Sequence, residues 1–192
     1  MHRIPTPIPL ILLLILVHLS GCLKTTLDSK ATNLDVFELA AENTQKLKVK
    51  VVNTSTKKTA GRQFLFVFIP FGRIVIKHPE DFLSRSFYTH LSIKGYKPIT
   101  HTHTNAYPQL PELSVEIDNF QATAYDYFFY RRIVCKIALT ATLNLPNQTQ
   151  KVWSGTIKKT AAKRYAFKPQ LENIFNKAIE AATLETIKNL RL

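Results

Sequence analysis

The stretch Ile133–Leu145 reads IVCKIALTATLNL, and it decides the fold. Its odd positions are all apolar, whereas its even positions carry Lys136, Thr140 and Asn144 among others. Alternation with a period of two is typical of a β-strand that has one core-facing side and one wetter side. The stretch therefore predicts a long strand in a sheet that is covered on one face only.

The segments on either side extend this sheet. Upstream, Leu113, Val115 and Ile117 begin a strand with apolar residues at odd positions. Downstream, Pro146-Asn147-Gln148 predicts a turn into a hairpin partner over Lys151–Thr160. Such short connections favour antiparallel neighbours.

The first half of the chain adds shorter strands. Lys46–Val52 alternates lysine with aliphatic residues, which predicts a strand. Phe64–Ile69 and Arg73–Lys77 are two apolar segments, and Pro70-Phe71-Gly72 between them predicts a sharp bend. Lys97–Glu112 contains three prolines and is expected to be an exposed loop.

Two helices complete the expected domain. Pro79 opens the first, which carries Glu80 and Asp81 in its first turn and ends at Gly95. The second begins near Pro169 and continues to the C-terminus with apolar residues near helical spacing. We expect an α+β fold in which a largely antiparallel sheet packs against two main helices.

The N-terminus has the pattern of a cleaved signal peptide. Arg3 precedes the apolar stretch Ile8–Val17, which is too short for the about 20 residues of a membrane-spanning helix. Leu19, Ser20, Gly21 and Cys22 then resemble the lipobox of bacterial lipoprotein precursors. The resemblance implies cleavage before Cys22 and attachment of several acyl chains there, which makes membrane binding durable. The alternative is an ordinary secretory signal with an incidental cysteine.

The lipobox divides the chain into a signal peptide over residues 1–21, a lipidated N-terminus and flexible tether over 22–41, and a single periplasmic domain over 42–192. In the lipoprotein pattern, an Asp directly after the cysteine favours the inner membrane. Leu23 stands there and favours the outer membrane. Because Arg3 is the only charged side chain in 1–21, cleavage lowers the formal charge from +13 to +12.

Beyond the lipobox, residues 80–190 resemble the YajG-like lipoproteins, which are outer-membrane lipoproteins of Gram-negative bacteria with no established activity. The resemblance lies in a helix ending in Gly-Tyr, the long strand Ile133–Leu145, the hairpin to Trp153-Ser154-Gly155, and the final helix. A similar element order belongs to LptE and, more loosely, to auxiliary lipoproteins of lipid-transporting ABC systems. The resemblance implies a non-enzymatic envelope protein. The alternative is an accessory subunit of lipopolysaccharide or phospholipid transport.

The basic surplus suggests a face for an anionic ligand, such as lipopolysaccharide phosphates or anionic headgroups. Nucleic acid would fit the charge, but an export signal argues against it. The candidate residues are Lys46, Lys48, Lys50, Lys158, Lys159, Lys163 and Arg164. The alternative is that these lysines serve only solubility.

A second candidate surface, for a partner protein, is an aromatic and arginine cluster. Exposed aromatic and arginine side chains are favoured at protein interfaces, whereas aromatics of a long hairpin can instead be core residues. The candidates are Tyr125, Tyr127, Phe129, Arg131 and Arg132.

Nothing in the sequence predicts an enzyme, a metal or a cofactor. There is no glycine-rich phosphate loop and no nucleophile elbow. His101 and His103 could contribute metal ligands, but no cluster of further ligands accompanies them. Cys135 lies between apolar residues and is expected to be a buried small hydrophobe instead of a nucleophile.

Overall fold

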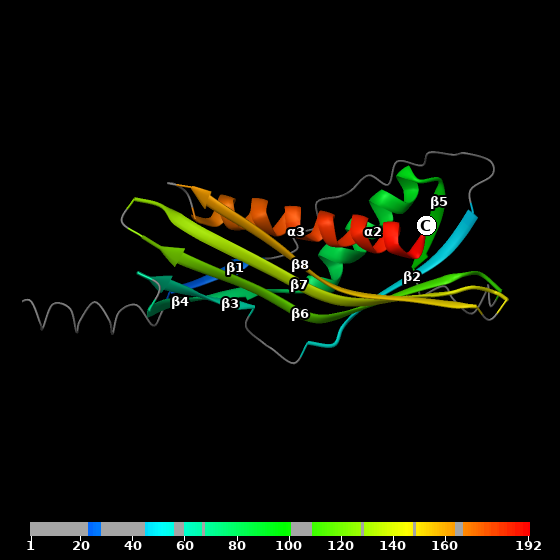
Figure 1. Cartoon of the computed structure of the whole chain (residues 1–192), viewed down its shortest axis with the longest axis horizontal. Helices are drawn as coiled ribbons and strands as arrows, with labels where there is room; N and C mark the ends of the chain where they lie inside the picture. Colours follow the sequence, from blue (N-terminus) through cyan, green and yellow to red (C-terminus); the bar gives the residue numbers. More distant parts are fainter. Residues whose placement is uncertain are drawn as a thin grey trace, which may run out of the picture.

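The computed structural model describes residues 23–27, 45–55, 60–66, 68–100, 109–127, 129–147, 149–163 and 167–192. Within them, eight strands form one sheet, and two helices lie against it (Figure 1). The strands are β1 (Leu23–Leu27), β2 (Gln45–Asn53), β3 (Gly61–Leu65), β4 (Ile69–Ile76), β5 (Tyr96–Thr100), β6 (Glu112–Asp126), β7 (Arg131–Asn144) and β8 (Gln150–Lys163). The helices are α2 (Pro79–Ile93) and α3 (Phe167–Leu190).

The long meander β6–β7–β8 confirms the strongest sequence prediction. β7 pairs antiparallel with β6 and β8 along its whole length. Its odd residues from Ile133 to Leu143 are buried, and they face α3. The even residues lie on the opposite face, which we call the outer face because neither helix covers it (Figure 1).

The sheet as a whole is mixed, so the prediction of a largely antiparallel sheet is wrong. β6 is the central strand, and its first half pairs parallel with β2 while its second half pairs parallel with β3. β5 also pairs parallel with β2, and β1 with β4. Parallel partners need a crossover connection, and α2 lies in the chain between β2 and β6.

Three short elements differ from the sequence expectations. Pro70-Phe71-Gly72 was expected to be a bend but lies inside β4. The strand tolerates Pro70 because the pairing of β3 with β4 shifts register between Gln63 and Phe64, so Pro70 stands at an irregularity where no regular ladder hydrogen bond is needed. Tyr96–Thr100 was expected to belong largely to a loop but forms β5. Leu23–Leu27, within the segment expected to be a tether, pairs as β1 with β4. Residues 28–41 of that segment lie outside the described residues.

Both predicted helices are confirmed. α2 begins at Pro79 with acidic residues in its first turn, and Gly95 follows its end with a positive φ of 87°. α2 packs on β2 and β5, and α3 packs on β7 and β8. Phe175 of α3 joins the layers, because its ring lies 4.8 Å from Phe82 of α2 and 4.8 Å from Phe120 of β6.

A bulge in β6 reverses which residues face the core. The pairing with β7 shifts between Ile117 and Asn119. Before the shift Val115 and Ile117 are buried, and after it Ala122 and Ala124 are buried. The extra residue changes the parity of the strand, so Gln121, Thr123 and Tyr125 point to the outer face.

Candidate functional site

The three lysines of β2 share the outer face, as their alternation predicts, but they do not form a free cationic surface. Lys48 is only 6% exposed, between Ile99 of β5 and Glu112 of β6 in register. The neighbouring positions of β6 on the same face include Glu116 and Asp118. Glu112 stands opposite Lys48, and Glu116 stands opposite Val52, two residues beyond Lys50, whereas Lys46 pairs with Lys97 of β5. Carboxylates therefore lie beside Lys48 and Lys50 in this half of the face.

The remaining four predicted cations do not come together on one face of the sheet. Lys158 pairs with Lys136 and lies on the outer face, whereas Lys159 pairs with the buried Cys135 and lies on the helix side. The backbone of Lys163 pairs with Arg131, and its side chain is not among those described. Arg164 lies outside the described residues. The seven candidates thus do not form a single patch.

A different set of cations does come together on the outer face. The register places Lys24, Arg73 and Arg62 in one row across β1, β4 and β3. The adjoining rows on β7 and β8 add three more cations. All six side chains are exposed, and we call them the basic patch: Lys24, Arg62, Arg73, Arg132, Lys136 and Lys158.

The basic patch contains like charges in direct opposition. Arg73 pairs in register with both Lys24 and Arg62, and Lys136 pairs with Lys158. Among the described residues, none of the six forms an ion pair, and no carboxylate lies on this half of the face. Like charges directly opposite each other are destabilising, so this half of the face is electrostatically suited to an anion.

A groove runs along the basic patch over β6, β7 and β8. Its volume is about 390 Å³, which falls in the range of small-ligand sites. Three cations line it beside apolar and hydrogen-bonding groups, which suits a molecule with both an anionic and an apolar part. The lining residues are Gln121, Thr123, Tyr125, Tyr127, Arg132, Val134, Lys136 and Lys158.

The residues of the predicted aromatic and arginine cluster do not form one surface. Tyr125, Tyr127 and Arg132 line the groove, whereas Phe129 lies at the turn between β6 and β7. Tyr125 stacks on Phe64 of β3 at 5.6 Å, and Tyr127 stacks on Tyr130 at 4.4 Å. Phe129 is 74% exposed at the turn between β6 and β7. Arg132 is exposed beside the groove and belongs to the basic patch.

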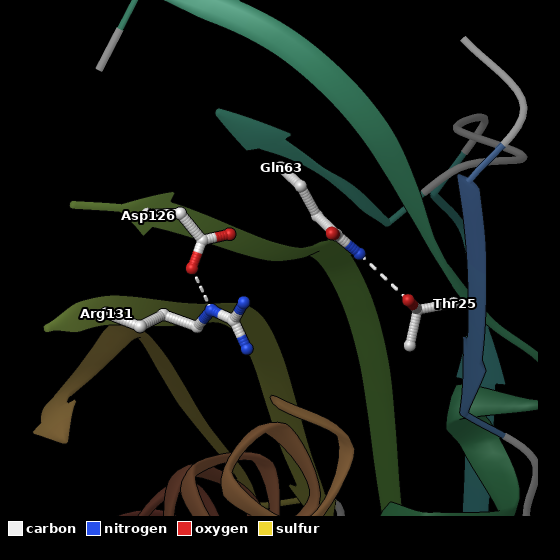
Figure 2. A network of polar contacts seen from close by, with 4 residues as sticks. All are labelled: Thr25, Gln63, Asp126 and Arg131. Atoms are coloured by element: carbon white, nitrogen blue, oxygen red, sulfur yellow. Dashed lines mark hydrogen bonds and ion pairs between the residues drawn. The ribbon is translucent and has the colours of Figure 1, made fainter. Parts of the chain in front are cut away.

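Arg131 has a structural partner and is not a free interface residue. Its guanidinium Nε donates to Oδ1 of Asp126, the residue opposite it on β6 (Figure 2). The pair closes the hairpin. Figure 2 also shows Gln63, which is 1% exposed and donates to the hydroxyl of Thr25 at 2.8 Å. This bond joins β1 to β3 across β4 on the helix side.

Cys135 is fully buried, and burial raises the pKa of its thiol to about 12. The thiol therefore stays protonated at neutral pH, which disfavours nucleophilic chemistry. We expect the folded protein at pH 8 to leave Cys135 unmodified by iodoacetamide, whereas the protein in guanidinium reacts fully. Mass spectrometry of the intact chain measures this. Rapid labelling of the folded state would contradict the burial.

Several other predicted sites lie in parts of the chain that the structure does not describe. Leu19, Ser20, Gly21 and Cys22 lie outside the described residues, as do His101 and His103. Within the described parts of the chain, no group of three or more histidine, cysteine or acidic residues is arranged to hold a metal. In the same parts, no helix combines the length and apolar composition needed to cross a bilayer.

Sequence reasoning missed four of the six residues of the basic patch, namely Lys24, Arg62, Arg73 and Lys136. Lys24, Arg62 and Arg73 are single cations on three short strands, and none stands in a charged run. One signal was available in the alternation of the strand. Ile74 and Ile76 are buried, so the odd position of Arg73 places its side chain on the opposite face. Only the register between strands shows that the three lie in one row.

No protein-family model matches the sequence, and a search of curated proteins gives no match either. A solved structure from Xanthomonas campestris, described under the family DUF330, has a similar fold. The TM-score is 0.51 at 12% identity, covering 87% of this chain and 90% of that one. Rare lipoprotein B from Shewanella oneidensis aligns with a TM-score of 0.44 at 9% identity over 75% of this chain and 93% of that one.

Proposed function

We propose that this chain is a lipid-anchored, non-enzymatic protein of the bacterial cell envelope, of YajG-like type, whose basic patch binds a phosphate-bearing envelope component. The observation that carries the binding function is the basic patch itself: six exposed cations, three of them opposed in one row, without a carboxylate among the described residues of that half-face. The proposed location is the outer membrane, with the domain in the periplasm.

The anchor rests on the sequence. Leu19-Ser20-Gly21-Cys22 follows a short apolar stretch and a basic start, which is the order of a lipoprotein signal. The anchor and the basic patch are complementary, because lipid attachment holds the domain beside phosphate-bearing headgroups. Each lysine or arginine near such a surface contributes about 1 kcal/mol to binding.

The phosphate chemistry could come from a lipid headgroup or from free phosphate. The test uses the lipidated protein in a neutral detergent, titrated calorimetrically with the bisphosphorylated glucosamine disaccharide of lipid A, with glycerophosphoglycerol, and with inorganic phosphate. Tighter binding of either headgroup than of inorganic phosphate supports a lipid ligand. Equal binding of all three supports a free anion. No binding of any of them would sink the proposal.

The matched variant is the double substitution Lys136→Gln/Lys158→Gln, which removes a like-charge pair from the groove. We expect headgroup binding to weaken about 30-fold, from about 1 kcal/mol for each lysine. The stability of the fold should stay unchanged or rise slightly, because the two lysines repel each other in register. Calorimetric titration and thermal unfolding measure the two effects.

The control is Lys50→Gln/Lys97→Gln, which makes the same change of charge on β2 and β5. These strands lie in the half of the sheet where Glu112 and Glu116 accompany the lysines. Affinity in this control should remain within about twofold of the wild type, because its sites lie more than a Debye length of about 10 Å from the groove. A loss equal to that of the groove variant would mean that net charge, and not the basic patch, governs binding.

A second candidate function is an accessory subunit of lipopolysaccharide or phospholipid transport. The observation that favours it is the mixed lining of the groove, where Tyr125 and Val134 lie beside Arg132 and Lys136. Such a lining suits an amphiphile. A transport subunit should co-purify with a barrel or a transporter from gently solubilised envelopes, whereas a stand-alone protein recovers only lipid.

A further inference from the structure

Two hairpin turns at one end of the sheet consist of large apolar and aromatic residues. The turn between β3 and β4 spans Leu-Phe-Val-Phe-Ile over residues 65–69, and that between β6 and β7 spans Tyr-Phe-Phe-Tyr over residues 127–130. Turns ordinarily use Gly, Asn, Asp, Pro and Ser. At the opposite end, the β7–β8 turn has the ordinary composition, and Asn147 accepts a bond from the N–H of Thr149 at 3.1 Å.

The two apolar turns lie side by side. Leu65 at the end of β3 pairs with Asp126 at the end of β6, and the N–H of Phe66 donates to the carbonyl of Asp126 at 2.9 Å. In Figure 1 the ends of these strands occupy the same extremity of the sheet, away from β2 and β5. We call the described residues of the two turns together the aromatic tip: Leu65, Phe66, Phe68, Ile69, Tyr127, Phe129 and Tyr130.

Four of the side chains of the aromatic tip are exposed. Phe68 is 73% exposed and Phe129 is 74% exposed, and Leu65 and Tyr130 are exposed as well. Of the seven large apolar side chains that are exposed in the described residues, four lie on this tip. Clustered exposure of this kind marks an interaction surface, whereas scattered single residues do not.

The fold holds these residues in place at a cost. Phe66 has a φ of 51°, a left-handed conformation that a bulky residue rarely adopts. A glycine or asparagine would take this position without strain, so turn formation alone does not explain an aromatic residue there. In the second turn, the Asp126–Arg131 pair (Figure 2) and the bond from Tyr127 N–H to Tyr130 O at 2.9 Å fix the backbone.

The N-terminal end of β1 indicates what the tip contacts. β1 runs parallel to β4, with Leu23 opposite Gly72, three residues from the start of β4 at Ile69. Strands rise about 3.3 Å per residue, so Leu23 lies about 10 Å from the tip along the sheet. Cys22 is bonded to Leu23, so a lipid on Cys22 is attached at this same end.

The position of Arg62 also fits a membrane surface as the partner of the tip. Arg62 lies three residues before Leu65, which places it about 10 Å behind the tip. This is about one Debye length, close enough for attraction to anionic headgroups. Aromatic rings with cations just behind them are the arrangement that proteins use at a membrane interface.

We propose that the aromatic tip inserts to the boundary between the headgroups and the acyl chains of the bilayer and stands the domain end-on, with the β6–β7 turn toward the membrane. The inference rests on the proposed lipid anchor for the side on which the membrane lies, and the composition, exposure and strain of the tip support it independently. The basic patch then lies just above the lipid surface, and the β7–β8 turn points away from it.

The experiment uses the lipidated protein reconstituted into neutral phosphatidylcholine vesicles, with and without bromine on the acyl chains. Phe68→Trp and Phe129→Trp each place an indole in the tip while keeping an aromatic side chain. Bromine quenches only indoles that reach the lipid. We expect the added fluorescence, after subtraction of the parent protein with its native Trp153, to fall to about half or less in brominated vesicles.

The matched control is Ile93→Trp, because Ile93 is also exposed but is the last residue of α2, which leads into β5 at the far end of the sheet. Its fluorescence should be insensitive to bromine. If the two tip variants are quenched no more than this control, the proposal is overturned, and a protein partner becomes the better occupant of the tip.

The choice of phosphatidylcholine distinguishes a failure of the tip proposal from a failure of headgroup binding by the basic patch. Phosphatidylcholine has no net charge, so failure of headgroup binding by the basic patch leaves quenching at the tip unchanged. Lys136→Gln/Lys158→Gln combined with Phe68→Trp should therefore be quenched as strongly as Phe68→Trp alone. Loss of quenching in this combination would show that insertion depends on the groove and would overturn the tip as an independent site.

Discussion

Replacing Gly61 with alanine is expected to lower the free energy of unfolding by at least about 3 kcal/mol. Gly61 of β3 pairs with Ala122 of β6, and the N–H of Ala122 donates to the carbonyl of Ala60 at 2.7 Å. A methyl group on Gly61 would collide with the carbonyl group of Ala122. Because the obstacle is backbone and not a side-chain end, β3 must move away from β6. Thermal and urea unfolding of the protein in neutral detergent measure the loss.

Gly155→Ala is the matched control for this prediction. There the added methyl would meet the ring of Trp153, which is a side chain that can turn aside. We expect a loss of about 1 kcal/mol. Equal losses at Gly61 and Gly155 would contradict the close approach of β3 to β6. The Gly61 variant should also bind the headgroup probes more weakly, since β3 carries Arg62 and leads into β4 with Arg73.

Truncating Phe175 to alanine is the second large effect. The ring is 1% exposed, and it contacts Phe82 and Phe120 at centroid distances of 4.8 Å each. Removing a buried phenylalanine costs about 3–5 kcal/mol through lost transfer energy and the cavity that remains. Because Phe175 connects α3, α2 and the sheet, the helices should loosen together. A drop in the urea midpoint with an unchanged slope would report this loss.

Phe68→Ala provides the contrast, because Phe68 has the same side chain but is 73% exposed on the aromatic tip. Its stability should change by no more than about 0.5 kcal/mol. If Phe68→Ala destabilised the fold as much as Phe175→Ala, the tip would be part of the core. Such a result would count against a role of Phe68 at the membrane.

The strands that the sequence predicts best are those with long alternation. Ile133–Leu145 specifies both the strand and its buried face, and Pro146 with Asn147 specifies the hairpin that follows. Alternation does not specify the neighbour. β2 has a clear period of two, yet nothing in it indicates that it pairs with β5 and β6 in parallel. Only the tertiary contacts decide that.

Burial of charged residues was also beyond the sequence pattern. Lys48 alternates with aliphatic residues just as Lys46 does, but β2 lies between two neighbours and leaves Lys48 little solvent. In the basic patch, conversely, cations that form no pattern in the sequence come together on an exposed surface. Arg62 and Arg73 belong to strands of unremarkable charge, and the β3–β4 register brings them together. The sequence shows which cations exist, but their assembly depends on pairings between segments far apart in the chain.

The parallel pairing of β1 with β4 has a mechanical consequence. If the lipid on Cys22 holds the chain while the domain is tugged along the strand direction, the force enters at Leu23. It then acts along β1 and loads all five paired positions, Leu23 to Leu27, in shear. A strand peeled sideways would break its pairs one at a time, whereas a sheared strand must break them together. The bond from Gln63 to Thr25 adds a side-chain link across β4. With such an anchor, the short first strand would act as a clamp that passes tension from the anchored end of the chain into the sheet.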